Sequence, residues 1–265
     1  MIRAMVLAAG RGERMRPLTD ATPKPLLKVR GKSLLLWHLE ALARPGIDEV
    51  VVNTAWLGDQ VSQAFGSHFT LQQPDKNRES GLRIGYPEPG LSLAYSHEGR
   101  DFGGALETAG GIVRALPQLG EIFWVLAGDV FAPDFEFDPV AVERFSASDK
   151  LAHVWLVSNP DHHPAGDFGL SDHGLALNLP KGSPQPAYTY STIGLYRSAL
   201  FSPPFCDIAA GNPLGVKAPL GPILRAAMDA GRVSAEIYRG PWTDVGTPER
   251  LQWLNHGENG QIPLA

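Results

Sequence analysis

Apolar runs and segments of helical spacing alternate through the first quarter of the chain. Residues 2–8 form a short apolar run and residues 49–53 a second one rich in valine, so both are predicted strands. Residues 33–42 carry leucines at helical spacing between them, and residues 58–65 follow as a short helix. Parallel strands need such helical crossovers. The pattern therefore predicts a doubly wound, mostly parallel, Rossmann-like α/β sheet that is flanked by helices.

The middle of the chain continues this alternation after a polar interruption. Residues 66–90 are rich in polar residues, glycine and proline and supply little core, so we interpret them as an excursion. Further elements are expected as a strand at 91–96, a helix at about 107–116, a buried strand at 122–127 and a strand at 151–157.

Beyond residue 159, glycine and proline divide the chain into shorter segments. Residues 188–196 alternate in polarity and predict a strand. Two helices are expected near the end, one at about 219–230 and one that begins at about 247. A strand at 233–238 is expected between these two helices.

Length and composition favour one large domain. The chain has 265 residues, of which 43% are hydrophobic, and this is enough for a continuous core. We assign residues 1–256 to that domain and residues 257–265 to a tail. The change of pattern near residue 159 divides the domain into halves at 1–158 and 159–256.

Charge and cysteine content exclude several classes of protein. The net charge is −5, and no block of consecutive lysines or arginines could follow a nucleic-acid backbone. Cys206 is the only cysteine, so an internal disulfide and a cysteine metal cluster are excluded. No apolar run reaches the roughly 18 residues of a membrane span, and the N-terminal one is too short for a signal peptide. We therefore expect a cytoplasmic protein that binds neither nucleic acid nor membranes.

A glycine-rich turn follows the first strand. It runs from Leu7 through Ala8, Ala9 and Gly10 to Gly12, and its backbone amides can approach phosphate oxygens. The turn lacks the Gly-Lys-Ser/Thr ending of a Walker A loop, and its glycine spacing is not that of the dinucleotide fingerprint. Because a two-glycine turn after a strand is often only a tight turn, neighbouring residues must identify its role.

Two cations follow this turn closely in the sequence. Arg14 lies two residues beyond the second glycine, and Lys24 lies between two prolines that stiffen its backbone. A lysine held in this way beside free amides favours a phosphate site over a solvated surface loop. Arg11 and Arg16 are expected to be solvated or auxiliary.

These motifs resemble the signature of the sugar-phosphate nucleotidyltransferases, and the resemblance extends over nearly the whole chain. In that family the first loop wraps a nucleoside triphosphate, an arginine and a lysine neutralise it, and an aspartate after the central strand binds magnesium. The matching positions are Gly10, Gly12, Arg14, Lys24 and Asp129. The resemblance implies catalytic roles for Arg14, Lys24 and Asp129, with Mg²⁺ as cofactor and a nucleoside triphosphate and a sugar 1-phosphate as substrates.

Asp129 also has a physical reason to bind a metal ion. It follows a buried strand, and ligands of α/β sheets lie at the carboxyl ends of the strands. Magnesium prefers one or two carboxylates together with phosphate oxygens. The second candidate ligand is Asp244, in an Asp-x-Gly-Thr element that resembles the family's late aspartate. The alternative is that Asp244 only leads into the last helix, which Thr247 could cap unaided.

The segment 106–111 resembles the family's nucleobase loop, in which small residues let the base approach the backbone. Glu98, at the end of the preceding strand, could accept a hydrogen from uracil or from guanine, so it does not decide the nucleotide. The predicted nucleotide-binding residues are Leu7, Ala8, Ala9, Gly10, Gly12, Arg14, Lys24, Asn53, Glu98, Thr108, Gly110 and Gly128.

Weaker motifs assign the sugar phosphate mainly to the half at 159–256, which leaves 1–158 as mainly the nucleotide-binding half. The predicted sugar-phosphate-binding residues are Asn159, Asp167, Phe168, Thr192 and Lys217. Many relatives that use a hexose 1-phosphate carry a Glu-Lys-Pro element, but here the region reads Asn-Leu-Pro-Lys over 178–181, which argues against glucose 1-phosphate. The resemblance implies UTP and N-acetylmuramic acid 1-phosphate, as in peptidoglycan recycling. The acidic lactyl group would need a cation or an amide donor nearby, and Lys217 or Lys181 could serve. GTP with mannose 1-phosphate is the alternative pair.

Two hypotheses from other classes remain. A dinucleotide-dependent oxidoreductase would need another glycine spacing and an acidic residue after the second strand. A non-catalytic nucleotide sensor would have little reason to keep Lys24, Asp129 and Asp244 together. Adjacent His162 and His163 are expected to be solvated rather than to bind metal, because neighbouring side chains diverge. The sequence leaves the oligomeric state and any regulation open.

Overall fold

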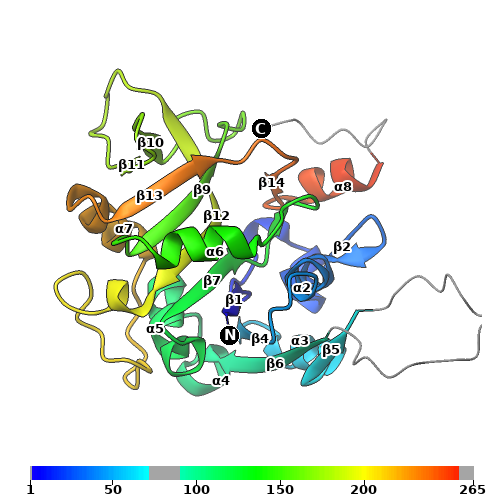
Figure 1. Ribbon diagram of the computed structural model, residues 1–265. Coiled ribbons are helices and arrows are strands. Elements are labelled where there is room, and N and C mark those ends of the chain that lie inside the picture. Colours follow the sequence, from blue (N-terminus) through cyan, green and yellow to red (C-terminus); the bar gives the residue numbers. More distant parts are fainter. Residues whose placement is uncertain (1, 72–89, 257–265) are drawn as a thin grey trace, which may run out of the picture.

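One large sheet with helices on both faces organises the chain (Figure 1). The computed structural model describes residues 2–71 and 90–256. The central strands are parallel neighbours, in the order β7 (Ile122–Ala127), β1 (Arg3–Leu7), β4 (Glu49–Thr54) and β6 (Gly90–His97). This arrangement confirms the predicted α/β fold with a mainly parallel central sheet.

Helices between these strands provide the crossovers that parallel pairing requires. They are α2 (Leu34–Ala43), α3 (Gly58–Phe65), α4 (Glu98–Phe102) and α5 (Glu107–Leu119). The side chain of Ser33 accepts a hydrogen bond from the Leu36 amide and so caps α2. Short elements lie between β1 and α2, namely η1 (Glu13–Met15), α1 (Leu18–Ala21), η2 (Lys24–Leu26), β2 (Lys28–Val29) and β3 (Lys32–Ser33).

Antiparallel strands extend the sheet at both sides. β5 (His68–Thr70) pairs with β6, and β12 (Ala187–Arg197) pairs with β7 on the opposite side. β12 also pairs with β9 (Ala152–Val157), which pairs in parallel with β13 (Val233–Ile237). The sequence missed β5, β10 (Phe168–Leu170) and β11 (Ala176–Leu177), because two or three residues are too few for an alternating pattern.

The end of the chain returns to the carboxyl end of β7. β14 (Thr243–Asp244) pairs antiparallel with β8 (Val130–Phe131), which follows β7 directly. Figure 1 shows α8 (Pro248–His256) beside β2 at this end of the molecule. The remaining elements are α6 (Pro139–Ser146), η3 (Ser198–Phe201) and α7 (Leu220–Asp229).

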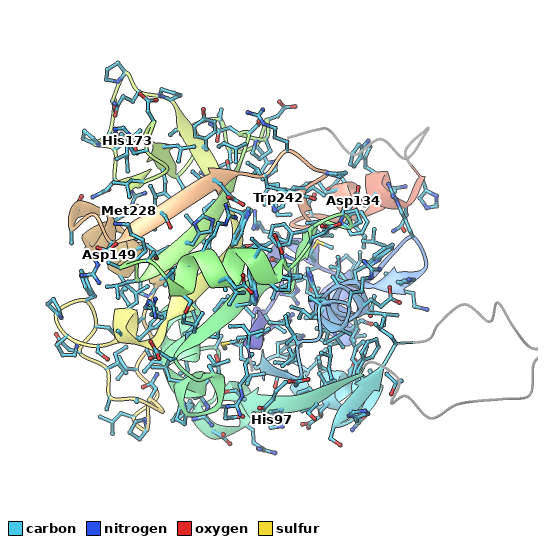
Figure 2. All side chains as sticks on the ribbon, viewed as in Figure 1. His97, Asp134, Asp149, His173, Met228 and Trp242 are labelled. Carbon is cyan, nitrogen blue, oxygen red and sulfur yellow. The ribbon has the colours of Figure 1, made fainter. Side chains whose placement is uncertain are left out.

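The alternation of side chains along the strands builds a core on each face of the sheet. On β1, Met5 packs in the cluster that contains α5 and α7, whereas Ala4 and Val6 pack in the cluster that contains α2 and α6. Figure 2 shows Met228 on α7, next to β13, where it belongs to the first of these clusters. The strands are therefore buried on both faces, as a doubly wound sheet requires.

Some sequence predictions lie outside the described residues. These are most of the excursion at 66–90, of which residues 72–89 are not described, and the tail at 257–265. The division into a nucleotide-binding half and a sugar-binding half stays a prediction. Within 2–71 and 90–256, no helix combines the length and the apolar character that crossing a membrane would take.

Candidate functional site

Three cavities lie in series near the carboxyl ends of β1 and β7. The inner cavity, of about 200 Å³, is lined by Gly10, Gly12, Glu13, Arg14, Met15, Lys24, Asp129 and Gly246. The central cavity, of about 540 Å³, shares Gly10, Lys24 and Asp129 with it. The outer cavity, of about 470 Å³, shares Asp167 and Arg225 with the central one and no residue with the inner one. The order inner, central, outer therefore defines one path along the site.

The loop after β1 forms one wall of this path. Gly12 has φ +69, and a Cβ there would approach Thr19 Cγ2 to 3.0 Å, so the turn depends on a glycine. Leu7, Ala8 and Gly10 line the central cavity, and Gly12 lines the inner one. Ala9 is buried and lines none of the three cavities.

Lys24 and Asp129 meet where the inner and central cavities join. Lys24 Nζ lies 2.6 Å from Asp129 Oδ2, and the lysine side chain is only 9% exposed. Pro23 and Pro25 flank this lysine in η2, so its ammonium group is held over the end of β7. A fixed cation beside freed backbone amides is suited to binding phosphate oxygens.

Arg14 lies in the inner cavity on the exposed side of the same loop. Arg11 is held elsewhere, with its guanidinium 3.6 Å from the centre of the Trp56 ring and Nη1 3.1 Å from the Thr19 carbonyl oxygen. Arg16 pairs with Asp20 at 2.8 Å. Arg14 and Lys24 are therefore the cations that this segment offers to the inner cavity.

Asp244 is brought beside Asp129 by the pairing of β14 with β8. The Val245 amide donates to the Asp129 carbonyl oxygen at 2.8 Å, which fixes the two backbones together. The Asp244 carboxylate contacts the Arg250 guanidinium and lies 2.8 Å from His162 Nε2. Asp129 lines the inner cavity, and Asp244 lies beside it, because a Cβ on the lining residue Gly246 would lie 2.7 Å from Asp244 Oδ2.

The two adjacent histidines are more than solvated residues, in contrast to the prediction. His162 contacts Asp244, and His163 Nε2 lies 3.1 Å from Asp167 Oδ1. The side chains do diverge, as expected for neighbours, but each reaches a different carboxylate of the site. Among the described residues, no group of three histidine, cysteine or acidic side chains could hold a metal ion.

The residues in and beside the inner cavity suit a hard divalent cation that also contacts the substrate. Magnesium is usually held by one or two carboxylates and by substrate phosphates, not by a cage of protein ligands. Asp129 and Asp244 provide the two carboxylates, and Lys24 and Arg250 compensate their charge in this structure. The donor set therefore fits Mg²⁺.

His38 on α2 lies close to Asp129 but adds no positive charge to the site. Burial lowers the pKa of His38 to about 4, although the nearby Asp129 carboxylate opposes the shift. The imidazole is therefore neutral near pH 7. Lys24, Arg14 and Arg250 remain as the positive charges beside the two carboxylates.

Glu98 lines none of the three cavities, and its predicted contact with the base stays a prediction. Its side chain is fully buried at the start of α4, and burial raises its pKa. One carboxylate oxygen accepts from Asn53 Nδ2 at 2.7 Å and the other from the Leu106 amide at 2.8 Å. Asn53 Oδ1 in turn accepts from the Ala8 amide at 2.7 Å. Glu98 and Asn53 therefore connect the loop after β1, through Ala8, to the loop before α5, through Leu106.

Replacing Glu98 with glutamine should consequently affect stability rather than nucleotide choice. A glutamine amide would turn a donor toward Asn53 Nδ2 or the Leu106 amide, and one buried donor would lose its acceptor. We expect the free energy of unfolding to fall by about 1–3 kcal/mol. Urea unfolding measures this loss, with Glu107→Gln at the cavity wall as the matched control. An unchanged stability with an altered preference between UTP and GTP would contradict this role.

The predicted nucleobase loop is only partly open to the cavities. Thr108 and Glu107 line the central cavity, and Glu107 has φ +61. Gly110 instead lies against the segment before α7. The approach is so close that a Cβ at this position would lie 2.5 Å from the Val216 carbonyl oxygen. Its amide donates to the Ala218 carbonyl oxygen at 3.1 Å. Gly110 therefore permits close packing and is not exposed to a ligand.

The predicted sugar residues also divide into two groups. Asp167, Phe168 and Thr192 line the central cavity, and Thr192 has φ +65 where the register of β12 shifts. Asn159 Nδ2 donates to the carbonyl oxygens of Ala187 and Pro164, and Asn159 Oδ1 accepts from the Thr189 hydroxyl. Lys217 is exposed and lines none of the three cavities, while Lys181 lines the outer one. Asn159 and Lys217 are thus not brought to the cavity walls.

Sequence reasoning missed several residues of the site. Arg225 and Tyr190 line the central cavity, and Arg250 and His162 hold Asp244. Arg225 carried no signal in the sequence beyond its place on the predicted helix at about 219–230, and only the folded chain brings it to the same cavity as Leu220 and Leu224. The contact of His162 with Asp244 joins chain segments that are far apart in the sequence, whereas Arg250 follows Asp244 by six residues.

Comparison with known proteins gives the same identification as the site. The sequence profile of the family described as nucleotidyl transferase matches residues 3–257. An N-acetylmuramate alpha-1-phosphate uridylyltransferase of Neisseria meningitidis is 42% identical, over 95% of this chain and 96% of that protein. A protein of the same name from Caulobacter vibrioides is 32% identical, over 93% of this chain and 92% of its own.

A solved structure supports the fold. It is that of a candidate glucose-1-phosphate thymidylyltransferase from Bacillus anthracis in complex with a sucrose, with a TM-score of 0.73 and 22% identity over 96% of this chain and 94% of that one. Since the family profile spans nearly the whole chain and two relatives exceed 30% identity over nearly all of both partners, the family is established. The chain belongs to the sugar-1-phosphate nucleotidyltransferases, whose substrates are a nucleoside triphosphate and a sugar 1-phosphate.

Proposed function

We propose that this enzyme joins UTP and N-acetylmuramic acid 1-phosphate to UDP-N-acetylmuramic acid and pyrophosphate, as a step of peptidoglycan recycling. The observation that carries this proposal is the 42% identity to the Neisseria meningitidis uridylyltransferase over nearly the full length of both chains. The central and outer cavities together also leave room for a sugar with bulky substituents.

The proposed reaction needs no nucleophile from the protein. An oxygen of the sugar phosphate attacks the α-phosphorus of UTP, and the bond from that phosphorus to the departing pyrophosphate breaks. Catalysis then depends on positioning the two substrates and on compensating charge. Lys24 and Arg14 border the inner cavity and are assigned to the triphosphate. The sugar is assigned to the central cavity, between Asp167, Phe168 and Thr192.

Asp129 and Asp244 are proposed to hold Mg²⁺. A bound Mg²⁺ would polarise phosphoryl oxygens and offset their negative charge. The ion pairs of Lys24 with Asp129 and of Arg250 with Asp244 keep the carboxylates oriented and neutralised in this structure. Coordination of a metal ion would let Lys24 turn its charge toward the phosphates.

A matrix of substrates tests the proposed pair. UTP, GTP, CTP and dTTP are each offered with N-acetylmuramic acid, N-acetylglucosamine, glucose and mannose 1-phosphates, and released pyrophosphate is measured. The highest kcat/KM is expected for UTP with the muramyl substrate. A kcat/KM for GTP with mannose 1-phosphate at least about tenfold above that for UTP with the muramyl substrate would show that the proposed substrates are wrong. A tenfold ratio corresponds to about 1.4 kcal/mol of transition-state stabilisation. Membership of the family would be unaffected.

A further inference from the structure

In the part of the chain that the structure describes, Arg225 on α7 is a cation of the site without an anionic partner. Its side chain lines both the central and the outer cavity and is partly buried. Its guanidinium lies within ion-pair distance of no carboxylate among the described residues. An arginine that is partly withdrawn from water but unpaired has a strong tendency to bind an anion.

Neutral groups hold this guanidinium in place. Nη1 donates to Asn178 Oδ1 at 2.8 Å, and Nη2 donates to the Asp167 carbonyl oxygen at 3.1 Å. The guanidinium carbon also lies 5.0 Å from the centre of the Phe168 ring. Because arginine has five N–H donors, three remain for a ligand. The side chain is therefore oriented before a ligand binds.

Asp229 and Asp167, two acidic residues linked to the partners of Arg225, have carboxylates that are engaged by other groups. Both oxygens of Asp229 accept from Asn178 Nδ2 at 3.0 Å. Asp167 Oδ1 lies 3.1 Å from His163 Nε2, and Oδ2 accepts from the Tyr190 amide at 2.9 Å. Both carboxylates thus have other partners, and neither forms an ion pair with the guanidinium, so its charge is available.

The order of the cavities indicates which anion Arg225 would meet. The triphosphate is assigned to the inner cavity, and the sugar 1-phosphate must place its phosphate next to it. Arg225 lies at the opposite end of the central cavity, where it opens to the outer one. Lys181 lines that outer cavity as a second cation. An anion bound there would be carried on the sugar rather than on its phosphate.

We propose that Arg225 binds a carboxylate carried by a substituent of the sugar in the sugar 1-phosphate and thereby selects acidic amino sugars. This inference rests on the proposed function, since the lactyl ether of N-acetylmuramic acid carries such a carboxylate. It replaces the earlier choice between Lys217 and Lys181. Arg225 is the principal contact because it is held in place, while Lys181 is exposed at the far wall.

Two substrates that differ in this group provide the test. N-Acetylglucosamine 1-phosphate lacks the lactyl ether of N-acetylmuramic acid 1-phosphate and is otherwise the same. For Arg225→Met, kcat/KM with the acidic substrate is expected to fall roughly 10- to 100-fold, mainly through KM. With the neutral substrate it should stay at the wild-type value. Arg225→Lys should recover part of the loss, because lysine keeps the positive charge but lacks the planar guanidinium that can donate two parallel hydrogen bonds to a carboxylate.

Controls separate this effect from damage to the fold. Arg144→Met removes a 63% exposed arginine on α6 and should leave both substrates unaffected. If Arg225→Met does not fold, a lactyl carboxamide analogue offered to the wild-type enzyme should show the same selective loss. An equal loss with both substrates, or no loss, would overturn the role of Arg225. A wild-type enzyme that does not use the muramyl substrate would instead refute the proposed function.

Discussion

Replacing Lys24 with alanine should lower kcat by two to three orders of magnitude, while KM for the nucleotide changes little. The ammonium group is fixed between two prolines and only 9% exposed, so it can act on charge that develops in the transition state without reorganising. Loss of one such preorganised contact costs about 2.7–4 kcal/mol of transition-state stabilisation. Steady-state kinetics of pyrophosphate release measure the effect directly.

The matched control for Lys24 is Lys28, an exposed lysine on β2 in the same segment. Lys28→Ala should retain the wild-type turnover. Circular dichroism and thermal melting would check that Lys24→Ala is folded, because removing the lysine leaves the Asp129 carboxylate without its ion-pair partner. Wild-type turnover by folded Lys24→Ala at saturating substrates would show that Lys24 has no part in the chemical step.

The second large effect is expected for Asp129→Asn and Asp244→Asn. Each change should remove most of the magnesium-dependent activity, by roughly 100-fold or more, because an amide is a poor replacement for a carboxylate on this cation. The fold should persist, since the backbone bond from Val245 to Asp129 does not involve either side chain. The double variant should be little worse than either single one, because both changes would disable the same ion.

Binding of Mn²⁺, followed by electron paramagnetic resonance with the nucleotide present, gives a readout that does not depend on turnover. Weaker Mn²⁺ binding is expected in both variants. Asp134→Asn is the control, since Asp134 is an exposed residue on the loop after β8, labelled in Figure 2. If the two losses of activity simply multiply and Mn²⁺ binding is unchanged, the aspartates do not share an ion.

The parts of the fold that could be predicted are those whose pattern is local. β1, β4, β7 and α2 are long enough for their periodicity to be recognised, and each was predicted within about one residue of its observed ends. β8 and β14 have two residues each, so no periodicity identifies them. Their pairing is nevertheless what brings Asp244 to Asp129.

The site could be predicted where a motif alone determines the position of a side chain. The loop after β1 and Lys24 belong to this group, because glycine and proline constrain the backbone locally. Glu98 could not be placed, since a carboxylate at the end of a strand can face either a ligand or a neighbouring loop. Arg225 was missed because its environment is made by Asn178, Asp167 and Phe168, which pack on α7 only in the folded chain.

The central claim, direct transfer of a nucleotidyl group to a sugar phosphate, is tested most directly with UTP labelled at the α-phosphorus. With Mg²⁺ and N-acetylmuramic acid 1-phosphate, label should appear in the nucleotide sugar in amounts equal to the pyrophosphate released. Without the sugar phosphate, neither pyrophosphate release nor exchange of labelled pyrophosphate into UTP should occur, because no group of the protein takes up the nucleotidyl moiety. Pyrophosphate exchange in the absence of any sugar phosphate, or label retained on the protein, would contradict the account.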